Sequence, residues 1–404
     1  MKILIVTDTI PFPPLNGREL PIAKIFEIIS GRHAVDLLVL STGNKPFSPQ
    51  LSGLPKTINY LGNLPVKRTG AKKKIISIIQ TFKYPVSPYS YSLNPLKEII
   101  GNNQYDYVWI SPVSYYSFIP FCNKNNFRFF KKAALGLNDS KTYQYRDSLN
   151  ELLHSKAFKP QYIKEWLLSF LIEKEEKGFL ALADIVHVQT QNEYSKLLKI
   201  LPASAHTKIV AAPNGVKEEL FACSYNGVDS NTILYMTHLD GDRQIESEWF
   251  IKKVWQKIKE ELPNAKLLIV GKPPAQPLAY IKDDTSIIVN GYAADMVSLF
   301  NNVRLAVVPT FHGTGLINRI LDALTAGVPV ISTPQAIATF PGLDIGKQII
   351  AAGTVTSYAT AVTTLYNNKE QRLSVAANGK KYAAGFATWQ QSAEAIEKAM
   401  IDTL

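Results

Sequence analysis

A glycine-rich turn that leads into a predicted helix is the segment of this chain best suited to bind an anion. It lies within His312–Val330 and follows a strand-like run at Leu305–Pro309. Glycines let a ligand approach the backbone, and the amides at a helix start favour negative charge. The amides of Gly315 and Leu316 are therefore predicted to receive a phosphate.

Two charged side chains follow this turn, three residues apart on one face of the predicted helix. The guanidinium of Arg319 can hold a diphosphate oxygen, and the carboxylate of Asp322 can accept two hydroxyls of a ribose. The alternative interpretation is an ordinary helix start with an exposed ion pair, which contributes little stability.

Two other strand-to-helix junctions contain turn residues or cations. In Thr9–Leu20, Asn16 and Gly17 can adopt the left-handed turn that a close ligand approach requires. The alternative there is a connection stiffened by prolines. In Thr237–Gln244, Arg243 supplies a guanidinium, although two aspartates lie beside it.

Alternating strand-like and helical runs must position these junctions. One series starts at Lys2–Thr7 and a second at Thr232–Met236, which predicts an α/β protein with two Rossmann-like, doubly wound domains. We expect a first domain over 1–210 and a second over 211–385, with a last helix within 386–404 packing back on the first. Such sheets bind ligands where strands end and helices begin.

Composition limits the class of protein. The chain has 404 residues, of which 46% are hydrophobic and 19% charged, so it can bury two cores and is not disordered. Its two cysteines, Cys122 and Cys223, exclude a disulfide framework, and its six histidines lack ligand spacing. No apolar run is long enough to span a bilayer, and the apolar start is too short for a secretory signal. We therefore expect a cytoplasmic protein that binds no metal.

Basic residues are concentrated in one part of the chain. The net charge is +11, from 44 basic and 33 acidic residues, and a stretch without acids contains Lys67, Arg68, Lys72, Lys73 and Lys74. Isoleucines beside these lysines predict an amphipathic segment that lies on the inner face of the cell membrane. The alternatives are a solvated loop and an ordinary helix packed on the first domain.

The glycine-rich turn and its helix also resemble a known family. They are similar to the donor-site helix of nucleotide-sugar glycosyltransferases of the GT-B fold, family 4 and its relatives. The matching residues are Gly313-Thr314-Gly315, Arg319, Asp322-Ala323-Leu324 and Gly327-Val328-Pro329-Val330. The resemblance implies two Rossmann-like domains facing a cleft, with the nucleotide-sugar donor largely on the C-terminal domain.

Carried over residue by residue, the resemblance assigns roles to single positions. Asp322 stands where the family has the second glutamate of its paired acidic motif, which holds the donor ribose, and Thr314 stands where it has the first. His238 replaces an early glycine. Gly291 and Tyr292 match the turn that reads the nucleobase. Asn16 and Gly17 match the opening loop, whose glycine approaches the donor phosphates.

A carboxylate in the N-terminal half is the candidate for work on the acceptor. Asp139 lies in a segment that resembles one facing the acceptor, where it can orient or deprotonate a hydroxyl. Its alternative role is to cap the following helix. We expect Glu173 and Glu176, on the charged face of a helix predicted at Gln161–Leu182, to be solvated.

These observations predict a hexosyltransferase that moves a sugar from a nucleotide diphosphate sugar to a saccharide or lipid-linked acceptor hydroxyl. Arg319, Arg243 and backbone amides would stabilise the leaving diphosphate in place of a metal, and no separate cofactor is needed. Family resemblance implies retention of anomeric configuration and a role in bacterial surface polysaccharide, lipopolysaccharide or glycoconjugate synthesis. The rivals are an inactive scaffold on the same fold and a sugar-nucleotide epimerase. Nucleic-acid binding rests on net charge alone and ranks last.

Overall fold

The structure is a computed structural model of the chain. It describes residues 1–14, 19–42, 53–68, 89–137, 140, 142–143, 146, 161–201, 209–225, 227, 229–239, 244–271, 273–274, 278–293, 295–311 and 316–404. Within these ranges, the side chains at 68, 161–169 and 279 are not described.

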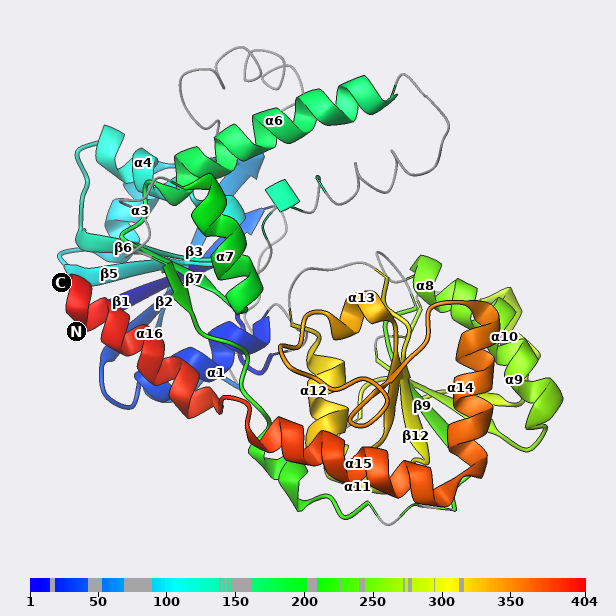
Figure 1. Ribbon diagram of the computed structural model, residues 1–404. Coiled ribbons are helices and arrows are strands. Elements are labelled where there is room, and N and C mark those ends of the chain that lie inside the picture. The colour runs from blue at the N-terminus through cyan, green and yellow to red at the C-terminus, as the bar shows by residue number, and fades with distance from the viewer. Residues whose placement is uncertain are drawn as a thin grey trace. The chain divides into compact units, whose positions relative to one another are not determined.

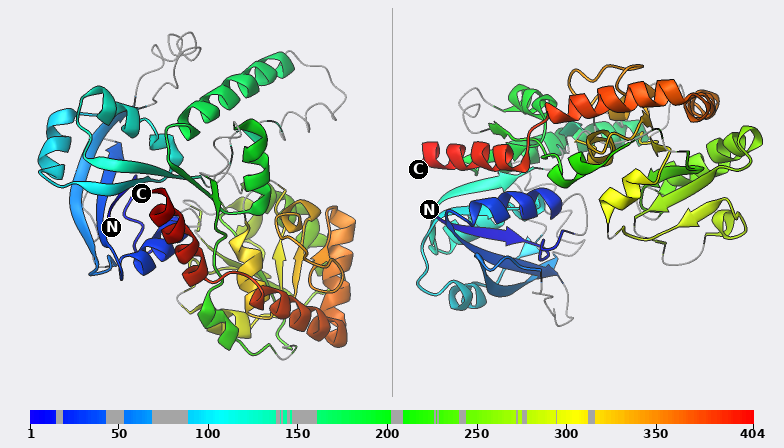
Figure 2. Two further views of the ribbon diagram at one scale, coloured as in Figure 1. Left: turned by 60° about the vertical axis from the view of Figure 1, so that its left-hand side comes forward. Right: turned by 90° about the horizontal axis from the view of Figure 1, so that it is seen from below.

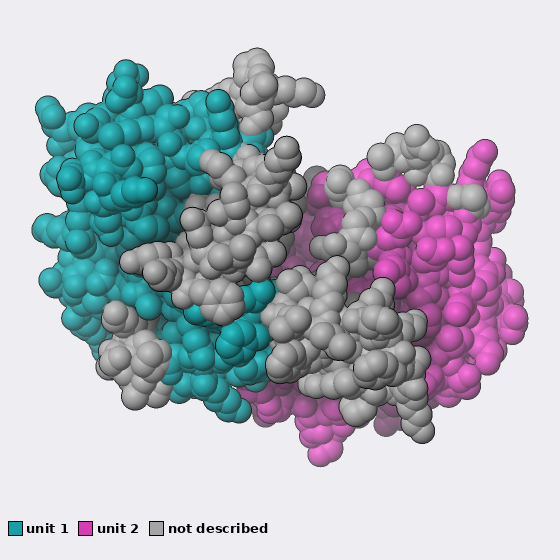
Figure 3. Space-filling model, turned by 90° about the horizontal axis from the view of Figure 1, so that it is seen from above, with its two compact units in different colours: residues 1–214, 389–404 teal, residues 215–388 magenta. Residues whose placement is uncertain are grey.

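The chain forms two compact units, coloured separately in Figure 3. Unit 1 consists of Met1–Asn214 together with Trp389–Leu404, and unit 2 consists of Gly215–Thr388. Each unit is an α/β domain built around its own sheet.

Unit 1 contains a sheet of eight strands in the order β4-β3-β2-β1-β5-β6-β7-β8, shown in Figure 1. Neighbouring strands run parallel except for β3 and β4, which are antiparallel. The strands are β1 (Lys2–Thr7), β2 (Ala34–Thr42), β3 (Ile58–Arg68), β4 (Tyr89–Ser90), β5 (Tyr105–Ile110), β6 (Phe130–Gly136), β7 (Ile185–Val188) and β8 (Ile209–Ala211).

Helices cover both faces of this sheet because successive residues of a strand point to opposite sides. Ile3 and Ile5 of β1 pack into one apolar cluster and Leu4 and Val6 into the other. The helices are α1 (Glu19–Ile29), α3 (Leu93–Ile100), α4 (Phe118–Lys124), α6 (Gln161–Leu180), α7 (Gln191–Ile200) and α16 (Trp389–Thr403), with a 3-10 turn, η1, at Val113–Tyr115.

The C-terminal helix is part of unit 1. It lies beside α1, as Figures 1 and 2 show, and buries Ile396 and Met400 in the same cluster as α1. The hydroxyl of Tyr107 donates to the carbonyl oxygen of Met400 at 3.0 Å. Glu397 accepts from Arg32 at 2.8 Å. The last residues of the chain therefore complete the first domain.

Unit 2 contains a fully parallel sheet of six strands in the order β11-β10-β9-β12-β13-β14. The strands are β9 (Thr232–Met236), β10 (Lys266–Val270), β11 (Ile287–Val289), β12 (Leu305–Val308), β13 (Val330–Ser332) and β14 (Ile350–Ala351). Their order places β9, the first strand of the unit, beside both β10 and β12. The strand order therefore reverses between β9 and β12, which is the usual location of a ligand site in such sheets.

Two layers of helices cover the unit 2 sheet. One layer packs with Ile233 and Tyr235 of β9, and the other with Leu234 and Met236. The first layer consists of α8 (Gln244–Trp249), η5 (Phe250–Trp255), α9 (Gln256–Glu261), α10 (Ala279–Lys282) and α14 (Val355–Asn367). The second consists of η3 (Glu218–Ala222), α11 (Met296–Asn301), α12 (Asn318–Thr325), α13 (Pro334–Ile337) and α15 (Lys369–Ala384).

The bounds of β1 and β9 match the predicted runs that start the two series. The strand β3 was not predicted, and it lies in a part of the chain that contains several prolines. Its pairing with β2 shifts register between Leu37 and Leu38, and Gly62 has a φ of 141°. That irregularity and Pro65 hide the strand from a search for alternation.

Candidate functional site

A guanidinium occupies the point of unit 2 where the strand order reverses. Arg319, in the first turn of α12, donates from Nη1 to the carbonyl oxygen of Met236 at 2.7 Å and from Nη2 to Thr310 Oγ1 at 2.9 Å. Met236 is the last residue of β9, and Thr310 follows β12. Arg319 therefore joins the carboxyl ends of the two strands that flank the reversal.

Buried polar groups surround this guanidinium. The hydroxyl of Ser247 lies 3.3 Å from those of both Tyr235 and Thr237. It also donates to the carbonyl oxygen of His238 at 3.3 Å. These hydrogen bonds hold the chain in place where it leaves β9, because buried hydroxyl groups have no water with which to exchange partners.

Asp322 lies one turn further along α12 and pairs with a lysine. The residue is 8% exposed, and its Oδ2 accepts from Lys217 Nζ at 2.7 Å. Burial raises the pKa of the Asp322 carboxyl above its usual range, and the Lys217 ammonium acts in the opposite direction. The carboxylate predicted to accept ribose hydroxyls is thus held by a cation.

His238 and Tyr292 come from neighbouring loops and approach each other. Their ring centroids lie 6.3 Å apart in an edge-to-face arrangement. Gly291, with a φ of 47°, accepts through its carbonyl oxygen from the amide of Gly271 at 2.8 Å. Tyr292 is 57% exposed, so its ring is accessible beside the carboxyl ends of β9 and β10.

The start of α12 follows the glycine-rich turn. Leu316 is buried, and the helix begins at Asn318 with Ile317 as its N-cap. Seven other predicted site residues lie outside the described residues, namely Asn16, Gly17, Asp139, Arg243, Gly313, Thr314 and Gly315. The structure therefore brings together Arg319, His238, Tyr292 and Gly291 around the ends of β9, β10 and β12.

The predicted basic segment is only partly described. Lys67 and Arg68 end β3 and pair in the backbone with Ser90 and Tyr89 of β4. Lys72, Lys73 and Lys74 lie outside the described residues. Among the described residues, no helix is long and apolar enough to cross a membrane.

The prediction for Glu176 was wrong. This residue of α6 has no exposed surface, and its Oε2 accepts from Ser140 Oγ at 2.8 Å and from the amide of Thr142 at 3.1 Å. Glu173 is half-buried and pairs with Arg146 and Lys177. The helix face expected to be solvated instead contacts residues that follow β6, namely Ser140, Thr142 and Arg146.

Two residues near the unit 2 site were not anticipated. Lys217 pairs with Asp322, and Glu246 of α8 accepts from the amide of Phe311 at 2.8 Å. The local sequence contained no signal for Glu246, because α8 contains a second glutamate, Glu248, and is mostly polar. Nothing local pointed to Lys217.

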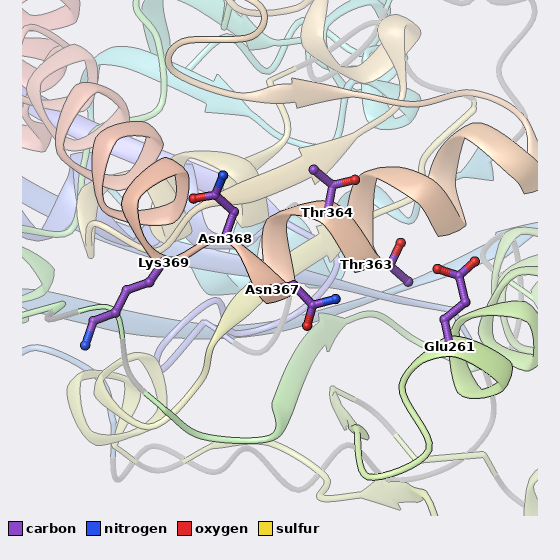
Figure 4. Close-up of a pocket in the computed structure, with 6 residues that line it drawn as sticks. All are labelled: Glu261, Thr363, Thr364, Asn367, Asn368 and Lys369. Atoms are coloured by element: carbon purple, nitrogen blue, oxygen red, sulfur yellow. The ribbon is translucent and has the colours of Figure 1, made fainter.

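A separate hollow in unit 2, of about 540 Å³, lies at the opposite edge of the sheet (Figure 4). Its lining comes from the C-terminal ends of α9 and α14, which run back toward the amino ends of the strands. The lining residues are Glu261, Thr363, Thr364, Asn367, Asn368 and Lys369. Ligands of doubly wound sheets bind at the carboxyl edge, so this hollow is not the candidate site.

Within the described part of the chain, no group of three or more histidine, cysteine, aspartate or glutamate side chains is arranged to hold a metal ion. Both cysteines are free and buried. Arg319 and Lys217 each bring a cationic side chain to this part of unit 2.

Comparison with known proteins finds a family similarity in the C-terminal part of the chain. Residues 230–368 match the family described as "Glycosyl transferases group 1". An uncharacterized glycosyltransferase of Methanocaldococcus jannaschii is 26% identical over 214 residues, which are 46% of this chain and 49% of that protein. The match thus spans about half the length of this relative.

Solved structures match the whole chain in fold. Sucrose-phosphate synthase from Thermosynechococcus elongatus has a TM-score of 0.70 at 14% identity, covering 100% of this chain and 99% of that one. HepE of Anabaena, in complex with UDP and glucose, has a TM-score of 0.63 at 14% identity, with 100% of both chains covered. WaaG, a glycosyltransferase involved in lipopolysaccharide biosynthesis, has a TM-score of 0.59 at 15% identity, with 99% of both covered. The predicted GT-B fold is confirmed.

Proposed function

From a GT-B fold with a group 1 glycosyltransferase domain at residues 230–368, we propose that this protein transfers a sugar from a nucleotide diphosphate sugar to an acceptor hydroxyl. The observation that supports this best is the placement of Arg319 at the carboxyl ends of β9 and β12. A fixed guanidinium at a strand-order reversal suits a diphosphate, and HepE, which is similar in structure, is in complex with UDP and glucose.

The proposed chemistry follows from charge. As the bond between sugar and diphosphate breaks, negative charge builds on the phosphate oxygen, and Arg319 stabilises it from a position already fixed by two hydrogen bonds. Leu316 and the glycine-rich turn bring backbone amides to the same diphosphate, and Arg243 adds a second guanidinium. Tyr292 and His238 flank the nucleobase, and Asp322 accepts from the ribose.

We further propose that the sugar is a hexose, that its anomeric configuration is retained, and that neither a metal nor a separate cofactor is needed. Asp139 acts on the acceptor hydroxyl. The product is a surface polysaccharide, lipopolysaccharide or glycoconjugate, in keeping with the involvement of WaaG in lipopolysaccharide biosynthesis. Analysis of the product anomer by NMR tests retention, and a product of inverted configuration would overturn it.

The test of donor binding uses the full chain and a thermal-shift panel of uridine, guanosine, thymidine and adenosine diphosphates and their sugars. A bound ligand raises the unfolding temperature by mass action, so one of the bases should give a shift. Arg319→Ala should abolish this shift. Arg128→Ala, which changes an arginine in unit 1, should keep it.

The outcome of this panel also separates the rival functions. Binding without transfer to any acceptor, and without hydrolysis of the donor, would support a scaffold on the transferase fold. Exchange of the sugar's configuration without an acceptor would support an epimerase. A shift that survives Arg319→Ala would remove Arg319 from the site.

We also propose that the protein associates peripherally with the anionic inner face of the cell membrane through Lys67, Arg68, Lys72, Lys73 and Lys74. Clustered cations are attracted to such a surface, and salt screens the attraction. The protein should co-sediment with anionic liposomes at low salt. Changing Lys72, Lys73 and Lys74 to glutamate should abolish this, and unchanged binding would refute the proposal.

A further inference from the structure

A buried carboxylate contacts the residue from which the chain enters the glycine-rich turn. Glu246 of α8 is 3% exposed, and its Oε1 accepts from the amide of Phe311 at 2.8 Å. Phe311 follows Thr310, whose hydroxyl accepts from Arg319, and directly precedes residues 312–315. Glu246 therefore joins α8 to the chain that leaves β12.

The same helix holds Phe311 by its ring. The indole of Trp249 packs edge to face on the Phe311 ring, with centroids 4.8 Å apart. Glu246 and Trp249 are three residues apart, so they lie on one face of α8. One face of α8 thus fixes both the amide and the side chain of Phe311.

Glu246 and the guanidinium of the site act in opposite directions on one buried hydroxyl, that of Tyr235. Burial is the main cause of the raised pKa of Tyr235; Arg319 lowers this pKa and Glu246 raises it. A carboxylate is costly to bury, so its position here needs a reason. A negative charge near a diphosphate would repel it, which argues against attraction of the ligand as that reason.

We propose that Glu246 is a positioning residue for the donor: by accepting from the amide of Phe311, it fixes the neighbouring Thr310, whose hydroxyl accepts from Arg319. The Arg319 guanidinium then meets the diphosphate from a position that is already fixed, which strengthens binding. This inference rests on the proposed function, because it concerns the same diphosphate site. Glu246 acts through Phe311 and does not touch the ligand.

Two conservative variants show whether the placement of the Glu246 oxygen or the charge of Glu246 affects donor binding. Glu246→Gln keeps a carbonyl oxygen at the same reach and removes the charge. Glu246→Asp keeps the charge and withdraws the acceptor by one methylene. Positioning predicts that Glu246→Gln binds like the wild type and Glu246→Asp binds more weakly, whereas a charge effect predicts the reverse.

The measurement is the dissociation constant of UDP, or of whichever panel diphosphate shifts the wild type most, by titration calorimetry on the full chain at fixed salt. We expect Glu246→Asp to weaken binding about tenfold, the scale of one hydrogen bond to a charged group. Glu246→Gln should stay within about threefold of the wild type. The control is Glu248→Gln, on the same helix, where Glu248 pairs with Lys252 at the surface; it should leave binding unchanged.

The outcomes are distinguishable. Equal binding by Glu246→Asp and the wild type would overturn the inference and leave Glu246 a role in stability, seen as a lowered unfolding temperature without ligand. Weak binding by Glu246→Gln alone would overturn it in favour of a charge effect. If the wild type bound none of the diphosphates, the proposed function would fall, and this inference with it.

Discussion

Replacing Lys217 by methionine removes the ammonium group that faces the buried Asp322 carboxylate. The two side chains are 22% and 11% exposed, and their charged atoms are 2.7 Å apart. Methionine has a similar length without a charge, so the variant leaves Asp322 with an uncompensated charge in an apolar part of unit 2. We expect unit 2 to be destabilised.

The magnitude follows from burial. Removing one partner of a fully buried ion pair costs roughly 3–5 kcal/mol, and an exposed pair contributes roughly 0–1 kcal/mol. Because the Lys217–Asp322 pair retains some exposure, we expect the free energy of unfolding of unit 2 to fall by about 3 kcal/mol, the lower end of the range for a buried pair. A loss of that size increases the population of the opened unit about 150-fold.

The loss should depend on pH in a direction that the structure determines. The folded protein raises the pKa of Asp322, so it binds the proton more tightly than the unfolded chain does. The unfavourable contribution of Asp322 is therefore absent below the ordinary carboxyl range, develops as the pH rises from the unfolded pKa to the folded pKa, and is complete above the folded pKa. Without Lys217 the folded pKa rises further, so the deficit of the variant should shrink as the pH falls from neutral toward the ordinary carboxyl range.

Hydrogen exchange read by mass spectrometry suits this test, because the chain has two units and need not unfold in one step. Peptides from α12 and β13 should exchange about 150-fold faster in Lys217→Met at neutral pH. Lys252→Met is the matched control, since Lys252 pairs with Glu248 at the surface of the same unit. Its α12 and β13 peptides should change little.

A double variant decides whether the effect belongs to the pair. In an Asp322→Asn background there is no carboxylate to leave unpaired, so Lys217→Met should add little further loss. The pair does not carry the effect if Lys217→Met accelerates exchange no more than Lys252→Met does. The same conclusion follows if Lys217→Met destabilises unit 2 equally in the wild-type and Asp322→Asn backgrounds.

Three further changes have expected outcomes. Gly271→Ala should lower the unfolding temperature of unit 2 in calorimetry, because Gly271 has a φ of 148° and a Cβ there would overlap the carbonyl oxygen of Thr237; the cost is at least about 2 kcal/mol. Glu176→Ala should cost about 2–3 kcal/mol in denaturant unfolding of unit 1, since Ser140 would keep a buried hydroxyl without its acceptor. Deleting Trp389–Leu404 should leave a chain that binds a hydrophobic dye, because α16 supplies part of the unit 1 core.

Each of these changes has a matched comparison. Gly342→Ala meets no atom within 4 Å at a φ of 72°, so it gives the cost of a positive φ without a steric overlap. Glu176→Gln keeps an acceptor for Ser140 and should recover most of the loss. A full-length chain with Ile401→Ala, a change to an exposed side chain of α16, should bind no more dye than the wild type.

Much of the architecture could be predicted from the sequence, because the strands and helices of an α/β domain show themselves in the periodic spacing of apolar residues. The buried runs of β1 and β9 alternate with amphipathic helices, and the glycine-rich turn before α12 stands at the end of a strand. The fold class and the two sheets follow from these local patterns, which also single out Arg319 as a candidate site residue. The strand β3 does not, because its pairing with β2 tolerates proline and a shift in register.

The partners of the charged residues were decided by the tertiary structure alone. Asp322 meets Lys217 across 105 positions of sequence, Arg319 meets Met236 across 83, and Glu246 meets Phe311 across 65. Helical and strand periods relate residues a few positions apart and say nothing about which loops the sheet brings to one edge. The sequence therefore determined which residue types stand at the ends of strands, and the order of strands in the sheet determined which of them touch.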